Sequence, residues 1–277
     1  MTHKKTYLLI KILFLLGIFL ASFSCKPRVI RRTRAIKDTS LASVMVRRKL
    51  LVGVHKFYPP YVTYGLNNVI TGFDVEVARE VARVMNVDIE FKPLAWSELI
   101  DGLAKHQIDC LWGTMSAAQV GNFDCIFSAP YMNSSLTVMV PADSIYSSIE
   151  ELASKTVGFL NLTDTESAAM ILSTGMKNFE NLHIYNDYDI ALDELRRRKI
   201  DALVLDIFSI SNLINNKEAF HMFNEPLNKM SYSVVFDRNS ESLRNRVTEV
   251  LIKLEYDGTL AKISRKWFGT DIIIIGK

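Results

Sequence analysis

Several segments of the chain carry amides and side chains suited to holding a small polar molecule. Residues 113–131, GTMSAAQVGNFDCIFSAPY, begin with small and hydroxyl residues, carry no charge before Asp124 and close on an aromatic, proline-containing turn. A loop of this kind leaves backbone amides free to bind a small ligand. The prolines of YPPY fix the turn that presents Tyr58. Asp206 ends the apolar run LVLD, where a buried carboxylate requires a partner.

Catalytic, metal and nucleotide chemistry are not indicated. The GxGxxG, GxxxxGK[ST] and GxSxG motifs are absent, and no CxxC or Cys/His spacing suggests a metal site. Beyond His55 and Asp206 the chain offers no pairing of an acid with a base, so we assign no catalytic residue and expect neither a cofactor nor a metal. Cys110 and Cys125 lie in apolar contexts, so a disulfide formed in an oxidising compartment and two free thiols are both open.

The first 25 residues predict that the protein is exported. His3, Lys4 and Lys5 precede an apolar run that is broken only by Lys11 and ends on small residues, which predicts a secretory signal over residues 1–25. An uncleaved membrane anchor is the alternative, because the run approaches bilayer length.

Charge divides the rest of the chain. Residues 1–25 carry +3 and residues 26–49 carry +8, while the whole chain carries +3, so residues 50–277 carry −8. We expect a basic, disordered spacer on an acidic domain. The spacer could also lie on anionic headgroups. We expect no nucleic-acid partner.

From Lys49 onward, apolar strand-like runs alternate with amphipathic stretches. KLLVGV, DIEFK and IDCLW predict strands, and residues 96–106 predict a helix. Residues 73–86 predict another helix, with one apolar face at Val77, Val81, Val84 and Met85. This βαβαβ order predicts a parallel sheet covered by helices.

The same pattern then begins again. LTVMV, KTVGFL, LHIYN, IDALVLD and YSVVF predict strands, and TDTESAAMIL and DIALDELRRRK predict helices. AKHQIDCLWG at 104–113 resembles RRRKIDALVLD at 196–206, which favours two similar lobes. We interpret Arg196–Lys199 as a helix end that favours cations through its dipole, rather than as a ligand patch. A last long helix is expected to end at Gly258, with an apolar stripe at Leu243, Val247, Val250, Leu251 and Leu254.

These features occur in one order, as VGVHKFYPPY, TGFDVEVAREVA, WSELIDGL, IDCLWGTMS, FSAPY, TVGFL, KIDALVLD and LEYDGTLAKISRKWFG. Together they resemble the polar amino-acid-binding proteins of ABC importers, the two-lobed periplasmic solute receptors, over about residues 50–269. The resemblance implies an α/β, type II periplasmic-binding-protein-like fold, with a ligand cleft between lobes joined by crossover strands near Tyr131–Thr137 and Glu225–Tyr232. The implied parts are a signal peptide at 1–25, a basic linker at 26–47, lobe 1 at 48–132 plus 229–270, lobe 2 at 133–228 and a C-terminal tail at 271–277.

The resemblance also implies aromatic contacts to the ligand. Tyr58 matches the aromatic that lines the ligand side chain, and Trp96 matches the one that covers its other face. Aromatic faces suit both apolar stems and cations. His55 stands where some family members carry an acid near the ligand side chain. Ordinary packing for Tyr58 and Trp96, and a surface-loop role for His55, are the alternatives.

The stretch that begins at Gly113 lies where the family has the pattern G-x-S-x-T-x-x-R, whose amides, hydroxyls and arginine bind the ligand's α-amino and carboxylate groups. Gly113, Thr114 and Ser116 keep the first half of the pattern, but Ala118 replaces the threonine and Gly121 replaces the arginine. The lost bidentate bond contributes roughly 1.5–3 kcal/mol, so its absence lowers the affinity for a free α-amino acid by about ten- to a hundredfold. The sequence therefore predicts altered ligand chemistry.

On the second lobe, Thr163 keeps the threonine of a Gly-Thr pair that meets the ligand carboxylate in the family. Thr163 and Glu166 also form a T-x-x-E capping box, so an ordinary helix cap is the alternative. Asp206 matches the carboxylate that receives the ligand's α-ammonium group.

The resemblance predicts an extracytoplasmic solute-binding protein of an amino-acid-type ABC importer, which binds a small amine-bearing ligand by lobe closure and then engages a membrane permease. SFSC resembles the lipobox of bacterial lipoproteins, in which Cys25 would be acylated, although Ser22 stands where leucine is preferred. A lipid at Cys25, or the uncleaved N-terminal segment, would anchor the protein to a membrane, in the periplasm or at the outer surface. The alternatives are a surface protein that reuses the fold and, less favoured, a periplasmic dehydratase-like enzyme.

Overall fold

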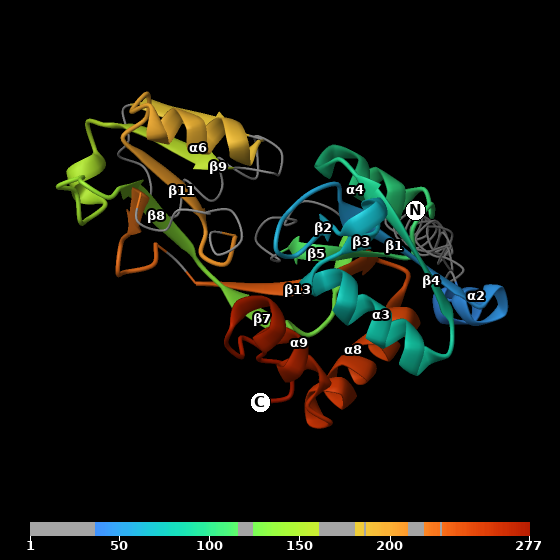
Figure 1. The fold of residues 1–277 in the computed structure, drawn as a ribbon. Helices are drawn as coiled ribbons and strands as arrows, with labels where there is room; N and C mark the ends of the chain where they lie inside the picture. The colour runs from blue at the N-terminus through green and yellow to red at the C-terminus, as the bar shows by residue number, and fades with distance from the viewer. Residues whose placement is uncertain (1–36, 116–123, 161–180, 186, 210–218, 228) are drawn as a thin grey trace, which may run out of the picture. The chain divides into compact units, whose positions relative to one another are not determined.

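The computed structural model describes residues 37–115, 124–160, 181–185, 187–209, 219–227 and 229–277 (Figure 1). Within those ranges, no helix has the length and apolar character that crossing a membrane requires. The described chain forms two larger sheets, each with its own helices, and a small hairpin of β2 (Thr63–Tyr64) and β3 (Ile70–Thr71). The predicted α/β class is confirmed.

The first sheet is mixed and has the strand order β4-β1-β5-β13-β6. β1, β4 and β5 run parallel, as the βαβαβ pattern predicts, while β13 is antiparallel to β5 and to β6. The bounds are β1 Lys49–His55, β4 Asp88–Leu94, β5 Cys110–Met115, β6 Cys125–Phe127 and β13 Met230–Asp237.

Helices cover both faces of this sheet (Figure 1). On β5, Cys110 and Trp112 join the apolar cluster of α3 (Phe73–Met85) and α8 (Glu241–Tyr256). Leu111, between them, joins the cluster of α4 (Trp96–Ala104) on the other face. This alternation follows from the two-residue period of a strand. The predicted stripe of α8 is fully buried, and its end is followed by Gly258 in a left-handed conformation, where α9 (Thr259–Phe268) begins.

The second sheet has the order β10-β9-β11-β8-β12. β9, β10 and β11 run parallel, and β8 is antiparallel to both β11 and β12. The bounds are β8 Leu136–Pro141, β9 Thr156–Leu160, β10 Asn181–Tyr185, β11 Ala202–Asp206 and β12 Phe220–Met222, with α6 at Tyr188–Arg196. β8 and β11 are buried along their whole length, which accounts for their unbroken apolar sequences.

A short strand, β7 (Met132–Ser134), leads from the first sheet into β8 of the second. It pairs antiparallel with the start of β13, from Met230 to Tyr232. The other edge of β7 is covered by the C-terminal tail, because Asn133 donates to the Ile272 carbonyl at 3.2 Å and Ile274 donates to the Tyr131 carbonyl at 3.0 Å. β7 is therefore flanked on both sides.

The predicted disordered spacer is wrong for its last part. Residues Ser40–Arg47 form helix α2, and Val44 is fully buried in the core of the first sheet. Asp38 explains why this segment folds, since its carboxylate accepts hydrogen bonds from the amides of Ser40 and Ser242 at the starts of α2 and α8. Charge counts along the sequence do not detect a contact between segments so far apart.

The two described cysteines are free thiols. Strand β13 lies between β5, which carries Cys110, and β6, which carries Cys125. Adjacent strands are about 4.8 Å apart, so these cysteines stand roughly 10 Å apart, beyond the limit of about 7 Å between Cα atoms for a disulfide. Burial is the main cause that raises the pKa of Cys110 well above its usual value and that of Cys125 to about 11.

Candidate functional site

The carboxyl ends of the parallel strands of the first sheet gather several residues that the sequence singled out. His55 ends β1 and pairs in register with Leu94, the last residue of β4, so Trp96 follows at the same edge. Gly113 and Thr114 lie towards the end of β5, which neighbours β1 on its other side. Open α/β sheets bind ligands at this edge. The backbone thus brings these predicted site positions together; ligand contact stays a prediction.

Tyr58 lies in a tight turn just after β1. Its amide donates to the Val62 carbonyl at 2.8 Å, and the Val62 amide donates back at 2.9 Å. The half-buried Tyr58 ring lies 6.3 Å from the His55 ring and 5.3 Å from the Tyr61 ring, between centroids. It also packs against the apolar cluster of the second sheet that includes Leu205. Tyr58 therefore contacts both halves of the described fold.

Gly113 is positioned by backbone geometry. Its φ of +140° favours glycine, and a Cβ there would lie 3.7 Å from Asp74 Oδ2. Asp74 is fully buried and accepts a hydrogen bond from the Tyr131 hydroxyl at 2.6 Å. Burial and the Asp74 carboxylate raise the pKa of Tyr131 well above its usual value, so that hydroxyl stays a donor. The Tyr131–Asp74 pair thus lies beside Gly113, at the start of the predicted binding loop.

Asp206, at the carboxyl end of β11, is the centre of a buried hydrogen-bond network and is only 3% exposed. Its Oδ1 accepts from the Tyr61 hydroxyl at 2.8 Å and from the Phe208 amide at 2.9 Å. Its Oδ2 accepts from the Ser134 hydroxyl at 2.5 Å and from the Tyr232 hydroxyl at 3.1 Å. A carboxylate offers about four acceptor positions, so protein donors occupy each of them.

The protonation states of this network follow from its burial. Burial raises the pKa of Asp206, while the hydrogen bonds from Ser134, Tyr61, Phe208 and Tyr232 act in the opposite direction. Burial, together with the Asp206 carboxylate, raises the pKa of Tyr61 and of Tyr232 well above the usual tyrosine value. Both phenols are therefore donors at neutral pH. Every acceptor position of the Asp206 carboxylate is therefore hydrogen-bonded, and a cationic or N–H-bearing ligand would have to replace one of the four donors.

Three residues of this network were missed by the sequence analysis. Tyr61 is the second tyrosine of the YPPY turn, while Ser134 and Tyr232 lie in the segments assigned to the crossover strands. Their hydroxyl groups were a signal, since a buried carboxylate needs donors. Their convergence on Asp206 was not visible, because 145 residues separate Tyr61 from Asp206.

Among the other predicted residues, His55 makes a local contact, and the rest lie outside the part of the chain that the structure describes. His55 is half-buried, and its Nδ1 accepts a hydrogen bond from the Phe57 amide at 3.2 Å. The Thr163 cap, the lipidation of Cys25, and the roles of Ser116 and Gly121 concern residues that the structure does not describe.

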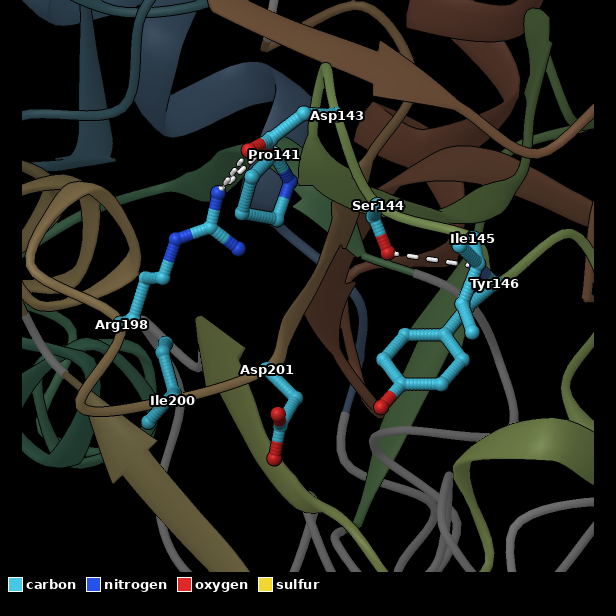
Figure 2. A pocket seen from close by; sticks show the side chains of 8 residues that line it. All are labelled: Pro141, Asp143, Ser144, Ile145, Tyr146, Arg198, Ile200 and Asp201. Atoms are coloured by element: carbon cyan, nitrogen blue, oxygen red, sulfur yellow. Dashed lines mark hydrogen bonds and ion pairs between the residues drawn. The ribbon is translucent and has the colours of Figure 1, made fainter.

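A pocket of about 190 Å³ lies at the opposite end of β11 (Figure 2). Arg198, in the turn before β11, faces Asp143 across it and forms an ion pair with that carboxylate. Asp201, also in the lining, accepts a hydrogen bond from the Thr156 amide at 2.9 Å. The pocket is separated from Asp206 by the length of the strand, roughly 16 Å. The structure places Arg196–Lys199 at the C-terminal end of α6, as predicted, and Arg198 in this run forms an ion pair with Asp143.

The chain belongs to the bacterial extracellular solute-binding proteins, family 3, whose model matches residues 50–270. The L-cystine-binding protein TcyJ of Escherichia coli (strain K12) is 26% identical over 235 residues, covering 84% of this chain and 87% of that protein. The structure of Tv2483 bound to L-arginine superposes with a TM-score of 0.77 at 23% identity, covering 87% of this chain and 99% of that one. The ancestral amino acid-binding protein AncCDT-1, a precursor of cyclohexadienyl dehydratase, has a TM-score of 0.72 at 25% identity, covering 83% and 99%.

These likenesses confirm the predicted family and the two-lobed type II fold. Proteins of this family are extracytoplasmic, and the homologues are amino-acid-binding components of ABC transporters.

Proposed function

We propose that the protein is the solute receptor of an amino-acid-type ABC importer and that it binds a small amine-bearing ligand, an amino acid or a derivative. Asp206 would receive the ligand's ammonium group, and Tyr58 and Trp96 would cover its side chain. Gly113, Thr114, Ser116 and Thr163 would bind its polar end, with His55 near the side chain. The protein acts by binding and not by turnover.

The observation that carries this proposal is the buried Asp206 carboxylate at the end of β11. Three hydroxyl groups and one amide hold it in place, so its orientation is fixed before a ligand arrives. L-cystine and L-arginine, the ligands named for two similar proteins, both carry an α-ammonium group.

The carboxylate end of the ligand is where this chain departs from its family. Gly121 offers no side chain to clamp a carboxylate. Either the amides near Ser116 and the helix start at Thr163 hold that group alone, or the ligand lacks a free α-carboxylate. We expect the receptor to tolerate amides and peptides at this end more readily than a protein with the arginine would.

The remaining parts of the proposal concern delivery. Lobe 1 (48–132 plus 229–270) and lobe 2 (133–228) would close on the ligand about the segments that contain β7 and the start of β13. The closed form would engage a membrane permease. The basic segment 26–37, with a lipid at Cys25 or the uncleaved N-terminal anchor, would hold the receptor at the membrane.

A thermal-shift screen of the purified protein tests this function. The panel contains the amino acids, L-cystine, their amides, di- and tripeptides and polyamines. One site at 100 times its Kd stabilises by about 2.7 kcal/mol, a shift of roughly 5–10 °C for a domain of this size. The matched variants are Asp206→Asn and, as a control on an exposed aspartate of the second sheet, Asp143→Asn.

The outcomes distinguish a solute receptor from a surface protein and from an enzyme. A shift that Asp206→Asn abolishes and Asp143→Asn retains supports the receptor. A shift that survives Asp206→Asn removes the assigned role of Asp206. No shift with any compound refutes the importer function and favours a surface protein, whereas turnover of a panel compound favours the dehydratase-like alternative, which the likeness to AncCDT-1 makes relevant. Gly121→Arg should raise the affinity for a free amino acid over its amide about tenfold or more.

A further inference from the structure

The four donors to Asp206 differ in how they are anchored. Ser134 and Tyr232 lie on β7 and β13, which are hydrogen-bonded to each other. The Phe208 amide lies only two residues beyond Asp206 in the chain. Among these donors, Tyr61 is the one that comes from the turn between β1 and β2, which follows the carboxyl end of β1. Its hydrogen bond therefore joins that turn directly to β11 of the second sheet.

The Tyr61 hydroxyl is held in place by the packing of its own ring. The side chain is fully buried, and its ring centroid lies 5.7 Å from Phe268 and 6.2 Å from Tyr232. Its carbonyl accepts from the Asp74 amide at 3.1 Å, within the first half of the fold. A phenylalanine at this position would keep these ring contacts and lose only the donor.

We propose that Tyr61 is a positioning residue that limits the affinity for the ligand's amine, because its hydroxyl occupies on Asp206 Oδ1 the place that the ligand's ammonium group takes. The inference rests on the proposed function, in which Asp206 receives that group. Without ligand, the hydroxyl satisfies a carboxylate that would otherwise be buried with one acceptor position empty. With ligand, a charged N–H donor replaces a neutral O–H donor.

The exchange sets how much each ligand gains at Asp206. An ammonium group adds a Coulombic attraction to the Asp206 carboxylate that a neutral hydroxyl lacks, so it displaces the Tyr61 hydroxyl with a gain. A neutral amide or hydroxyl of the ligand exchanges one neutral donor for another and gains nothing. Because either ligand must displace the same hydroxyl, Tyr61 lowers the affinity for an amine and for its neutral analogue by about the same factor, and in the wild type only the charged amine gains from the contact with Asp206.

Isothermal titration of Tyr61→Phe with L-arginine, L-cystine and their Nα-acetylated forms tests the exchange. Removing the internal competitor should tighten the binding of the free amine and of its acetylated form by similar factors, about tenfold, and should leave the preference between them unchanged. Tyr64→Phe, on the partly exposed hairpin strand β2, is the matched control and should leave both unchanged. Tyr232→Phe removes a donor to Oδ2 and should not tighten binding. Unchanged or weaker amine binding by Tyr61→Phe overturns the inference, as does equal tightening by Tyr232→Phe.

A second readout separates the exchange from the proposed function. If the wild-type protein binds neither L-arginine nor L-cystine nor any compound of the thermal screen, the proposed function is refuted on that result. Small-angle X-ray scattering of the unliganded proteins then decides the link between Tyr61 and β11. A larger radius of gyration for Tyr61→Phe than for wild type and Tyr64→Phe supports the link, and an unchanged radius overturns it.

Discussion

Replacing Asp38 by alanine should weaken the attachment of helix α2 to the start of helix α8. The Asp38 Oδ1 atom accepts from the Ser40 amide at 2.9 Å and from the Ser40 hydroxyl at 2.7 Å, and its Oδ2 atom accepts from the Ser242 amide. The Ser242 hydroxyl in turn accepts from the Leu41 amide at 3.3 Å. One side chain therefore serves the first turns of α2 and α8 together. Asp38, Ser40 and Leu41 precede residue 50, where the family match begins, whereas Ser242 lies within it.

The magnitude follows from helix capping. Loss of one N-cap acceptor costs about 0.5–2 kcal/mol. Asp38 serves two helix starts, so we expect a loss of about 2 kcal/mol, which lowers the Tm by roughly 4–8 °C for a domain of this size. Differential scanning calorimetry or circular dichroism at 222 nm measures this shift.

The effect of Asp38 should also depend on pH. Burial is the largest single influence and raises the pKa of Asp38, but the hydrogen bonds from Ser40 and Ser242 together outweigh it, so the folded-state pKa lies below the usual 3.8. A lowered folded-state pKa contributes stability that is present above the unfolded-state pKa and is lost as the pH falls through the folded value. The Tm deficit of Asp38→Ala should therefore be complete at pH 7 and shrink below about pH 4.

The control is Asp88→Ala at the exposed start of β4, because the Asp88 carboxylate makes no hydrogen bond or ion pair with any described residue. Equal Tm values for Asp38→Ala and Asp88→Ala at pH 7 would refute the capping role. A deficit of the same size at pH 3 and pH 7 would show that the charged carboxylate is not what stabilises the helix starts.

Two further predictions concern a glycine that has no room for a side chain and a buried isoleucine of the C-terminal tail. Gly72→Ala should lower the Tm strongly, because Gly72 has φ +131° and a Cβ there would lie 2.2 Å from a backbone carbonyl oxygen. Gly65→Ala is the matched control, since its Cβ would approach nothing closer than 3.7 Å. Similar Tm values for the two variants would contradict this steric argument. Ile273→Ala in the tail should cost about 2–4 kcal/mol by chemical denaturation, because the side chain is only 3% exposed beside β7, and a loss below 1 kcal/mol would mean that the tail is not part of the core.

Much of the fold was accessible from the sequence because its signals are local. The apolar spacing along 73–86 and along α8 predicts the buried faces of both helices, since a helix repeats every 3.6 residues whatever surrounds it. The unbroken apolar runs of β1 and β11 predict buried strands in the same way.

Part of the candidate site was accessible for the same reason. Parallel strands end at one edge, so predicting β1, β4 and β5 already places the positions of His55, Trp96 and Gly113 together. The spacer prediction failed beyond residue 37, because charge counting cannot detect a helix that is stabilised by a distant partner.

The sequence alone indicates the family and the alternation of strands and helices from β1 to β5, and it predicts that Gly121 stands where the family has an arginine. Contacts across the fold add which donors meet at Asp206, that Asp38 serves a helix start 204 residues away, and that β13 separates Cys110 from Cys125. Each of these depends on contacts between segments that are distant in the chain. Such contacts form because buried apolar surface brings the elements together, and no spacing within one segment records which partners result.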